Sequence, residues 1–187
     1  VEKDWSFLDF EDGGLKGKIE RIISGGNLKK TSKVLVSYGS EGFIDEVVSA
    51  WGFEFLVHVH DSLMILASVK EKYDEIKCWQ GEVVNIPDKW SDFDAVYLYF
   101  LPGIPLQLDQ LLAALATRCS PGARVVISYP GGKSGVEELK ERFPDVVLWS
   151  LPDRTRLLQA AAKYSFQLVE FVDEPQFYLS VLTLNAA

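Results

Sequence analysis

Residues 33–61 read KVLVSYGSEGFIDEVVSAWGFEFLVHVHD, and this stretch decides the fold. The β-branched run Val34–Val36 predicts a short strand, and apolar residues at helical spacing from Ile44 to Val48 predict a helix after it. Alternating apolar residues from Phe53 to Val59 predict a second strand. Strand, helix and strand in this order predict a βαβ unit of a parallel sheet. Such units bind nucleosides or dinucleotides where a helix N-terminus faces the strand ends.

The rest of the chain continues this alternation of strands and helices. Further strands are predicted over residues 76–81, 93–100, 124–129 and 146–149, further helices over 62–73, 106–119, 136–143 and 153–164, and a closing hairpin over 166–172 and 177–184. We expect residues 1–31 to form an N-terminal extension with a helix, and residues 32–187 to form the main domain. The predicted fold class is α/β, a Rossmann-like αβα sandwich whose mostly parallel sheet ends in a C-terminal antiparallel β-hairpin.

Composition and charge narrow the classes of function. The chain has 187 residues, a formal net charge of −8 and two cysteines, Cys78 and Cys119. The acidic surplus argues against a nucleic-acid binder, because such proteins use a basic surplus to displace counterions from phosphates. With so few cysteines we expect a reducing, intracellular compartment, without distinguishing the cytoplasm from an organelle matrix or stroma. The apolar runs have the length of strands, so we expect no membrane span. The first residue is Val1 rather than Met, which is compatible with removal of an upstream tag, transit peptide or propeptide.

Three short motifs accompany the later strands. Gln80-Gly81-Glu82 follows the third strand, Phe93-Asp94-Ala95-Val96 opens the fourth, and Cys119–Arg124 leads into the fifth. In this order and spacing they resemble the motifs of the class I S-adenosylmethionine-dependent methyltransferase family, over about residues 33–184. The resemblance implies a class I methyltransferase-like fold, and S-adenosylmethionine as the cofactor of an active member.

The segment after the first strand departs from that family's glycine-rich pattern. The family has an acid at the end of the strand and alternating glycines after it. This chain has Val36 at the acid position, Tyr38 at the first glycine position and Ser40 at the middle one. Gly42 stands at the last glycine position, and Gly39 falls between two positions. Glycines there permit positive φ and let a cofactor approach the bare backbone, so the tyrosine implies an eroded cofactor site.

Acidic residues remain near two other positions of the family's site. The resemblance implies that Glu82 contacts the adenine side of the cofactor, and that an acid after the second strand binds the ribose. Asp61 lies about one residue beyond that position, which His60 occupies, and a β-bulge in the strand would restore the alignment. Asp61 is equally explained as an acid that favours the N-terminus of the following helix. The candidate cofactor-binding residues are therefore Gly39, Gly42, Asp61 and Glu82.

Motifs for other chemistry are incomplete. The segment Tyr99–Pro105 lacks the polar residue with which amino-methyltransferases hold a target amine, so the catalytic residues stay unknown. Gly131-Gly132-Lys133-Ser134 follows a strand as a phosphate-binding loop would, but Ile127 stands where that motif needs its first glycine. His58 and His60 share one face of a strand without an evident third and fourth ligand, so we expect no metal site.

In the N-terminal extension, Trp5, Phe7, Leu8 and Phe10 would cover a sheet edge. Six aromatic residues lie near predicted element ends or in loops, where we expect most of them to cap the core and a cluster on one side to form a surface for a protein partner. They are Trp5, Phe7, Phe10, Trp51, Trp90 and Trp149. Two functions stay open. The first is a methyltransferase-like domain with an eroded S-adenosylmethionine site that serves as a non-catalytic module for interaction, assembly or regulation. The second is an active methyltransferase that acts on a small molecule or a protein through an atypical cofactor site.

Overall fold

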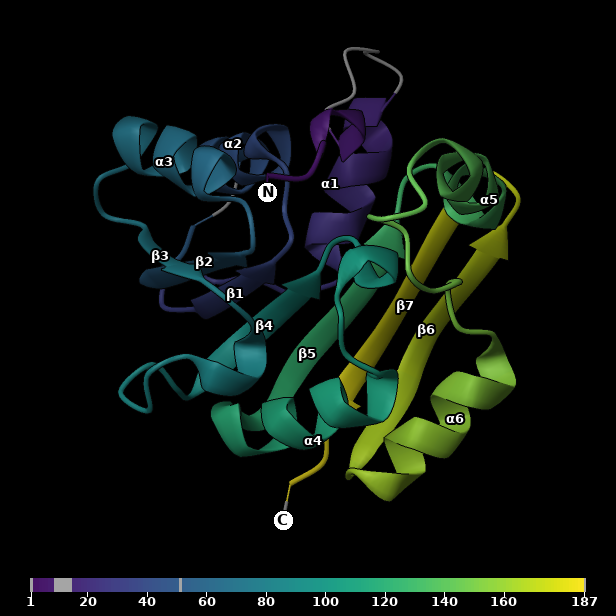
Figure 1. Cartoon of the computed structure of the whole chain (residues 1–187). Coiled ribbons are helices and arrows are strands. Elements are labelled where there is room, and N and C mark those ends of the chain that lie inside the picture. The colour runs from purple at the N-terminus through teal and green to yellow at the C-terminus, as the bar shows by residue number, and fades with distance from the viewer. Residues whose placement is uncertain (1, 9–14, 51, 187) are drawn as a thin grey trace.

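The computed structural model describes residues 2–8, 15–50 and 52–186, which form one seven-stranded sheet flanked by helices (Figure 1). The strands are β1 (Lys33–Ser37), β2 (Phe55–His60), β3 (Lys77–Gln80), β4 (Phe93–Leu98), β5 (Cys119–Tyr129), β6 (Phe166–Glu174) and β7 (Phe177–Leu184). The helices are α1 (Lys16–Ser24), α2 (Glu41–Ala50), α3 (Leu63–Lys72), α4 (Leu108–Arg118), α5 (Gly132–Arg142) and α6 (Arg154–Lys163), with short 3-10 helices η1 (Ser6–Leu8), η3 (Val83–Asn85) and η4 (Leu101–Gly103). The predictions for Phe10 and Trp51 concern positions outside the described residues.

The strand order has a topological switch point between β1 and β4, where the connections leave in opposite directions along the sheet. The order is β3-β2-β1-β4-β5-β7-β6, and every neighbouring pair is parallel except the two that involve β7. From β1 the chain first builds outward to β3 and then returns to place β4 on the other side of β1. Connections that leave in opposite directions open a crevice outside the carboxyl ends of the strands, where α/β folds bind ligands. The structure confirms the predicted fold class, including the closing antiparallel hairpin.

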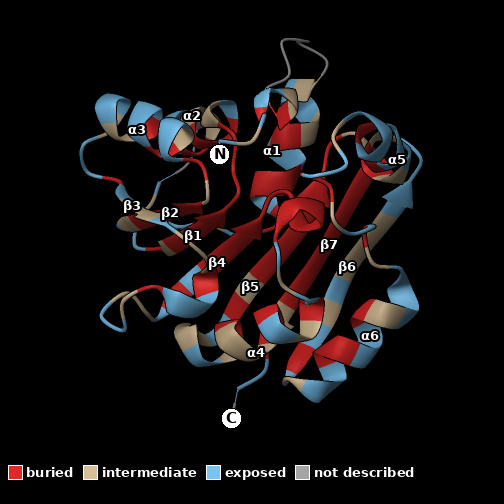
Figure 2. Cartoon of the chain, viewed as in Figure 1, coloured by how far each residue is buried: buried red, intermediate tan, exposed pale blue. Residues whose placement is uncertain are grey.

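The core lies on both sides of the central strands, which Figure 2 shows as a continuous buried band. Strands buried on both faces read as continuous apolar runs, and the segment Phe93–Leu98 is such a run. Ile22 and Ile23 of α1 are fully buried in the same core, so the N-terminal extension packs onto the main domain. The boundary after residue 31 stays a prediction. Within the described residues, no helix is long and apolar enough to cross a membrane.

Two predicted elements differ from the structure. Residues 146–149 form no strand, because the N–H groups of Leu148 and Trp149 both donate to the carbonyl of Pro102, at 2.8 and 3.2 Å, instead of pairing with the sheet. α5 begins at Gly132 rather than at residue 136. The sequence predicts a helix only from residue 136, whereas Gly132 turns the chain directly into the helix with a φ of 66°.

Candidate functional site

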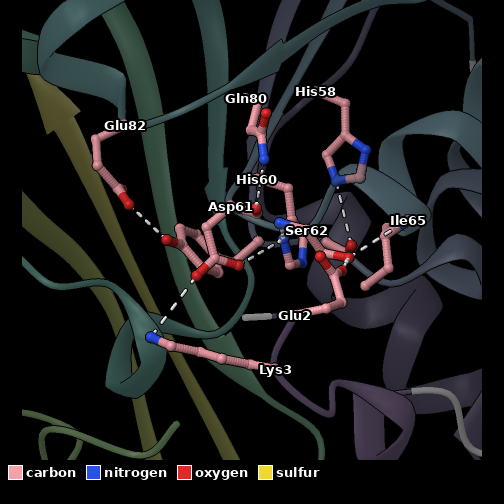
Figure 3. Close-up of polar contacts among 11 residues, drawn as sticks. Glu2, Lys3, His58, His60, Asp61, Ser62, Ile65, Gln80 and Glu82 are labelled. Atoms are coloured by element: carbon pink, nitrogen blue, oxygen red, sulfur yellow. Dashed lines mark hydrogen bonds and ion pairs between the residues drawn. The ribbon is translucent and has the colours of Figure 1, made fainter.

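The predicted acidic site residues meet at the carboxyl ends of β1, β2 and β3. Tyr38 follows β1, Asp61 follows β2, and Glu82 comes shortly after β3. The backbone stays paired just beyond the strands, since the N–H of Tyr38 donates to the carbonyl of Val59 at 2.9 Å. Figure 3 shows Asp61 and Glu82 near one another, with His60 beside them. These residues therefore lie together at the switch point of the sheet, the place where α/β folds bind ligands, which is here called the crevice.

Tyr38 occupies this crevice with its side chain. Its φ of 57° lies in the left-handed region, so the tyrosine keeps the backbone conformation that a glycine would adopt there. The side chain is fully buried, and its hydroxyl donates to Oε1 of Glu82 at 2.5 Å. Burial and this hydrogen bond raise the pKa of Tyr38 above its ordinary value, so the phenol remains a donor. Tyr38 thus links the end of β1 to the segment after β3.

The N-terminal residues Glu2–Leu8, here called the strap, cover the same crevice. The ring of Trp5 is 4% exposed, and its centroid lies 5.2 Å from that of Tyr38 and 5.0 Å from that of His60. Gly103 makes room for the indole, because a Cβ at that position would lie 2.9 Å from Cη2 of Trp5. The sequence left the role of these aromatic residues open, and in the structure Trp5 is part of the buried core and packs on residues that follow the central strands.

Polar contacts fix the strap beside Trp5. The Lys3 ammonium lies 3.7 Å from Oδ2 of Asp61, and the hydroxyl of Ser62 donates to the Glu2 carboxylate (Figure 3). Ser62 also caps α3, since its Oγ accepts from the N–H of Ile65 at 3.2 Å. The strap is therefore joined to the segment between β2 and α3.

Two buried histidines, His58 and His60, lie under the crevice. Nε2 of His58 is 3.1 Å from the carbonyl of Gly39, so this nitrogen carries the proton. Burial, with a smaller effect from His60, lowers the pKa of His58 to about 3. Nδ1 of His60 accepts from the N–H of Ser62 at 3.0 Å, so in the neutral ring Nε2 carries the proton. Among the described residues, no group of three or more potential metal ligands is assembled.

The two acids of the crevice have opposite pKa shifts. Burial raises the pKa of Glu82 to about 7, and nearby Asp61 adds to the shift against the hydrogen bond from Tyr38. Burial also raises the pKa of Asp61, but the His60 ring and the Lys3 ammonium outweigh burial and leave it below its ordinary value. Near neutral pH, Asp61 is therefore a carboxylate and Glu82 exchanges a proton.

Replacing Glu82 with glutamine will change how stability depends on pH. The folded pKa of about 7 lies above the ordinary value of 4.5, so the folded protein holds this proton more tightly than the unfolded chain does. The contribution of Glu82 to the free energy of unfolding is fully present below its pKa in the unfolded chain, and it is lost as the pH rises through its pKa in the folded protein. The free energy of unfolding of wild type relative to Glu82→Gln should therefore fall between about pH 5 and pH 8, as measured by urea denaturation. Glu141→Gln, at an exposed carboxyl of α5, is the control. A difference that is flat with pH would refute the assignment.

The four candidate cofactor-binding residues have different environments. Asp61 and Glu82 share the crevice, and Gly42 lies in the first turn of α2. Gly39 is packed tightly, since a Cβ there would lie 2.6 Å from Cγ1 of Val36. The bulge that would realign Asp61 is absent, because residues 55–60 of β2 pair with β1 and β3 without a register shift. The positions of these four residues do not by themselves show whether the protein binds a cofactor.

Sequence reasoning missed that Trp5 and Lys3 belong to the crevice. Both lie in a short segment without strand or α-helix, and their partners come from distant parts of the chain. A large aromatic residue directly after the charged run Glu2–Asp4 was the available signal, and it did not indicate which surface Trp5 covers. Further along the strap, a cavity of about 500 Å³ lies between η1, α1 and α5, walled in part by Phe7, Tyr129 and Phe143.

Neither a known family profile nor a curated protein matches this sequence. Solved structures do match. One comes from the complex between the Haloferax volcanii Trm112 methyltransferase activator and a methyltransferase, with a TM-score of 0.76 at 12% identity over 100% of both chains. An S-adenosylmethionine-dependent methyltransferase from Mesorhizobium loti matches with a TM-score of 0.70 at 14% identity, over 91% of this chain and 100% of that one. The geranyl diphosphate C-methyltransferase from Streptomyces coelicolor matches with a TM-score of 0.70 at 11% identity, over 90% of this chain and 77% of that one. At these identities the likeness is one of fold.

Proposed function

We propose that this chain, which has the fold of the class I S-adenosylmethionine-dependent methyltransferases, is a non-catalytic module of that fold that acts by binding another protein, in assembly or in regulation. One observation carries the proposal. Tyr38 and Trp5 pack against each other in the crevice where folds of this type bind their ligand. The chain's own side chains therefore take the place that a cofactor would need.

The side chains around the crevice do not fit S-adenosylmethionine. The family resemblance implies an acid at position 36, and the residue there is a fully buried valine, Val36. Tyr38 puts a phenol where the first glycine would leave bare backbone. Asp61 is already in contact with Lys3. No step of methyl transfer is derived through this crevice.

Support for a protein partner comes from the surface next to the strap. Leu63 and Met64, in the first turn of α3, are 59% and 69% exposed. Contiguous exposed apolar surface marks sites of protein interaction, and these two side chains would contribute to such a surface. The Haloferax volcanii structure with the same fold was solved as a complex with an activator protein. Both observations favour binding of a protein.

Wild type should give no heat of binding with S-adenosylmethionine or S-adenosylhomocysteine. Isothermal titration and thermal shift at about 1 mM ligand are the measurements. A ligand present at about 100 times its Kd would add about 2.7 kcal/mol to the free energy of unfolding and raise the melting temperature by several degrees. An unchanged melting temperature supports the proposal. Micromolar binding of either ligand to wild type would overturn it.

An active methyltransferase with an atypical cofactor site is the second candidate. The observation that favours it is the retained geometry around the crevice, where Tyr38 has the positive φ of a glycine and Asp61 lies near Glu82. Methyl transfer to a good nucleophile depends largely on orientation, so the lack of an obvious catalytic motif counts little against it. The titration with S-adenosylmethionine and S-adenosylhomocysteine distinguishes this active methyltransferase from the non-catalytic module.

A further inference from the structure

The first two turns of α3 carry apolar side chains on the side that faces solvent. Figure 2 shows α3 at the edge of the molecule with an exposed outer surface. Leu63 and Met64 are exposed, and so is Ala67, one turn further along the helix. Leu66 and Val69, on the inner side of the helix, are buried. The buried side attaches α3 to the domain, so the fold itself does not account for the apolar residues on the outer side.

A notch lies beside these residues, between α3 and the strap. Its volume is about 210 Å³, and Met64 and Ile65 form part of its wall. Strap residues 2–6 form another part. Apolar side chains that stand next to a depression offer the relief on which the side chains of a second helix pack, and the small Ala67 lets the axis of such a helix come close. The shape of this surface therefore suits a helix laid along α3.

The notch is acidic. Glu2, Asp4 and Asp61 bring three carboxylates to it or to its margin, and Lys3 brings one ammonium, which lies 3.7 Å from Oδ2 of Asp61. The carboxylates of Glu2 and Asp4 accept hydrogen bonds from neutral serine groups, which do not cancel their charge. Arg142 of α5 also acts on Asp4, by lowering its pKa, and the sum of these five charges is still negative.

The negative charge continues along the outer side of α3. Glu71 follows Ala67 by one turn and is exposed. The neighbouring lysines are engaged by other acids, since Lys70 pairs with Asp74 and Lys72 pairs with two acids of α2. The apolar residues of α3 therefore lie between an acidic notch at one end and an acidic residue at the other.

These charges distinguish among the possible occupants of the surface. A second copy of the chain, related by a two-fold axis, would bring the same carboxylates close to one another, and such contacts between like charges are unfavourable. An anionic membrane would be repelled by the same carboxylates and by the net charge of −8. An amphipathic helix with basic residues beside its apolar stripe complements both the apolar residues and the acids.

We propose that Leu63, Met64 and the notch bind a basic amphipathic helix of a partner protein. Its apolar stripe packs on α3, and its arginine or lysine side chains meet Glu71 and the acids of the strap. One long basic side chain enters the notch, with its aliphatic stem along α3 and its cationic group at the strap acids. This rests on the proposed function, because it assigns the surface by which a protein-binding module of this fold would hold its partner.

The first experiment measures binding of a labelled peptide to the full chain by fluorescence anisotropy. The peptide has about 18 residues, enough to form a helix, with leucine and alanine on one side and arginine on the other. Wild type should bind it with a micromolar Kd, and the double variant Leu63→Ser/Met64→Ser should bind it about tenfold more weakly. Leu158→Ser is the matched control, because it removes an exposed leucine from α6, and it should match wild type.

A second set of variants tests the charges. Glu2→Gln/Asp4→Asn/Glu71→Gln should weaken binding and make the Kd less dependent on salt, because salt screens attraction between surface charges. A control variant makes the same three kinds of change at exposed acids elsewhere, Glu137→Gln/Glu141→Gln/Asp145→Asn. It should bind the peptide as wild type does. A peptide with glutamate in place of every arginine should not bind.

Several results would overturn this surface. One is equal peptide affinity in wild type and in Leu63→Ser/Met64→Ser, and another is no binding by wild type at about 100 μM. Dimerisation of wild type, or its binding to phosphatidylserine vesicles, would also overturn the proposal if the serine variant abolished it, because a different occupant would then be shown. Micromolar binding of S-adenosylmethionine to wild type would instead overturn the proposed function. The peptide and the cofactor thus report the two failures separately.

Discussion

Gly132→Ala will lower the free energy of unfolding by about 3 kcal/mol or more. Gly132 has a φ of 66°, which alanine adopts only with strain. A Cβ there would also lie 2.5 Å from the backbone N of Phe177 and from the carbonyl oxygen of Pro175. The first atom belongs to the start of β7 and the second to the turn between β6 and β7, so neither can shift without disturbing the hairpin. Urea denaturation followed by circular dichroism measures the change.

Two other glycines provide the controls. Gly122 has a φ of 83° but nothing within 4 Å of an added Cβ, so Gly122→Ala isolates the cost of the backbone conformation, about 1–2 kcal/mol. Gly17 lies in α1 with nothing within 4 Å, so Gly17→Ala should raise stability by up to about 1 kcal/mol. Equal losses for Gly132→Ala and Gly122→Ala would show that the contact with the hairpin is unimportant.

The environment of Gly132 also accounts for the segment that resembles part of a phosphate-binding loop. The N–H of Ser134 donates to the carbonyl of Pro175 at 3.1 Å, and the Lys133 ammonium pairs with Asp173 at 2.8 Å. This amide and this lysine, which a phosphate site would use, are committed to the β6–β7 hairpin. The glycines there serve close packing of α5 on the sheet.

Tyr38→Gly will destabilise the protein by about 2–4 kcal/mol, although it restores a glycine where the backbone favours one. Loss of a fully buried aromatic side chain costs about 3–5 kcal/mol, and relief of the left-handed conformation returns about 1–2 kcal/mol. The variant also leaves Oε1 of Glu82 without its donor. The melting temperature and the urea midpoint are the measurements.

Two variants separate the contributions at Tyr38. Tyr38→Phe keeps the ring and removes only the hydrogen bond to Glu82, so it should cost about 1–2 kcal/mol. Ser165→Gly changes an exposed residue with a φ of 66°, so it reports backbone relief alone and should change stability by less than about 1 kcal/mol, toward higher stability. If Tyr38→Gly were as stable as wild type, the phenol would not be a structural part of the crevice.

Local patterns in the sequence predicted most of the fold. Buried strands such as Phe93–Leu98 are continuous apolar runs, and the cap at Ser62 was recognisable from its own position. A short apolar pattern at Val146 and Val147 predicted a strand that does not form. The N–H groups that follow these residues donate to the carbonyl of Pro102 instead of pairing with the sheet. The βαβ pattern of residues 33–61 predicted the parallel pairing at the centre of the sheet, because strands that follow one another in such a unit, here β1 and β2, pair directly.

The crevice was only partly predictable, since its contacts join residues far apart in the chain. The motifs located Asp61 and Glu82 and identified Tyr38 as a departure from the glycine pattern. They could not reveal that the Tyr38 hydroxyl reaches Glu82, or that Trp5 packs on the rings of Tyr38 and His60. Such contacts depend on the direction of side chains across three strands, which no local spacing encodes.

The packing of Trp5 against Gly103 also determines when the strap can dock during synthesis of the chain. Trp5 is synthesised before Gly103 and before Phe143, whose ring lies 5.1 Å from that of Phe7. Trp5 and Phe7 therefore stay undocked until most of the sheet exists, and they are exposed to chaperones and to other nascent chains meanwhile. Ribosome-stalled chains that end before residue 103 should leave Trp5 open to a fluorescence quencher, while chains released at full length should shield it.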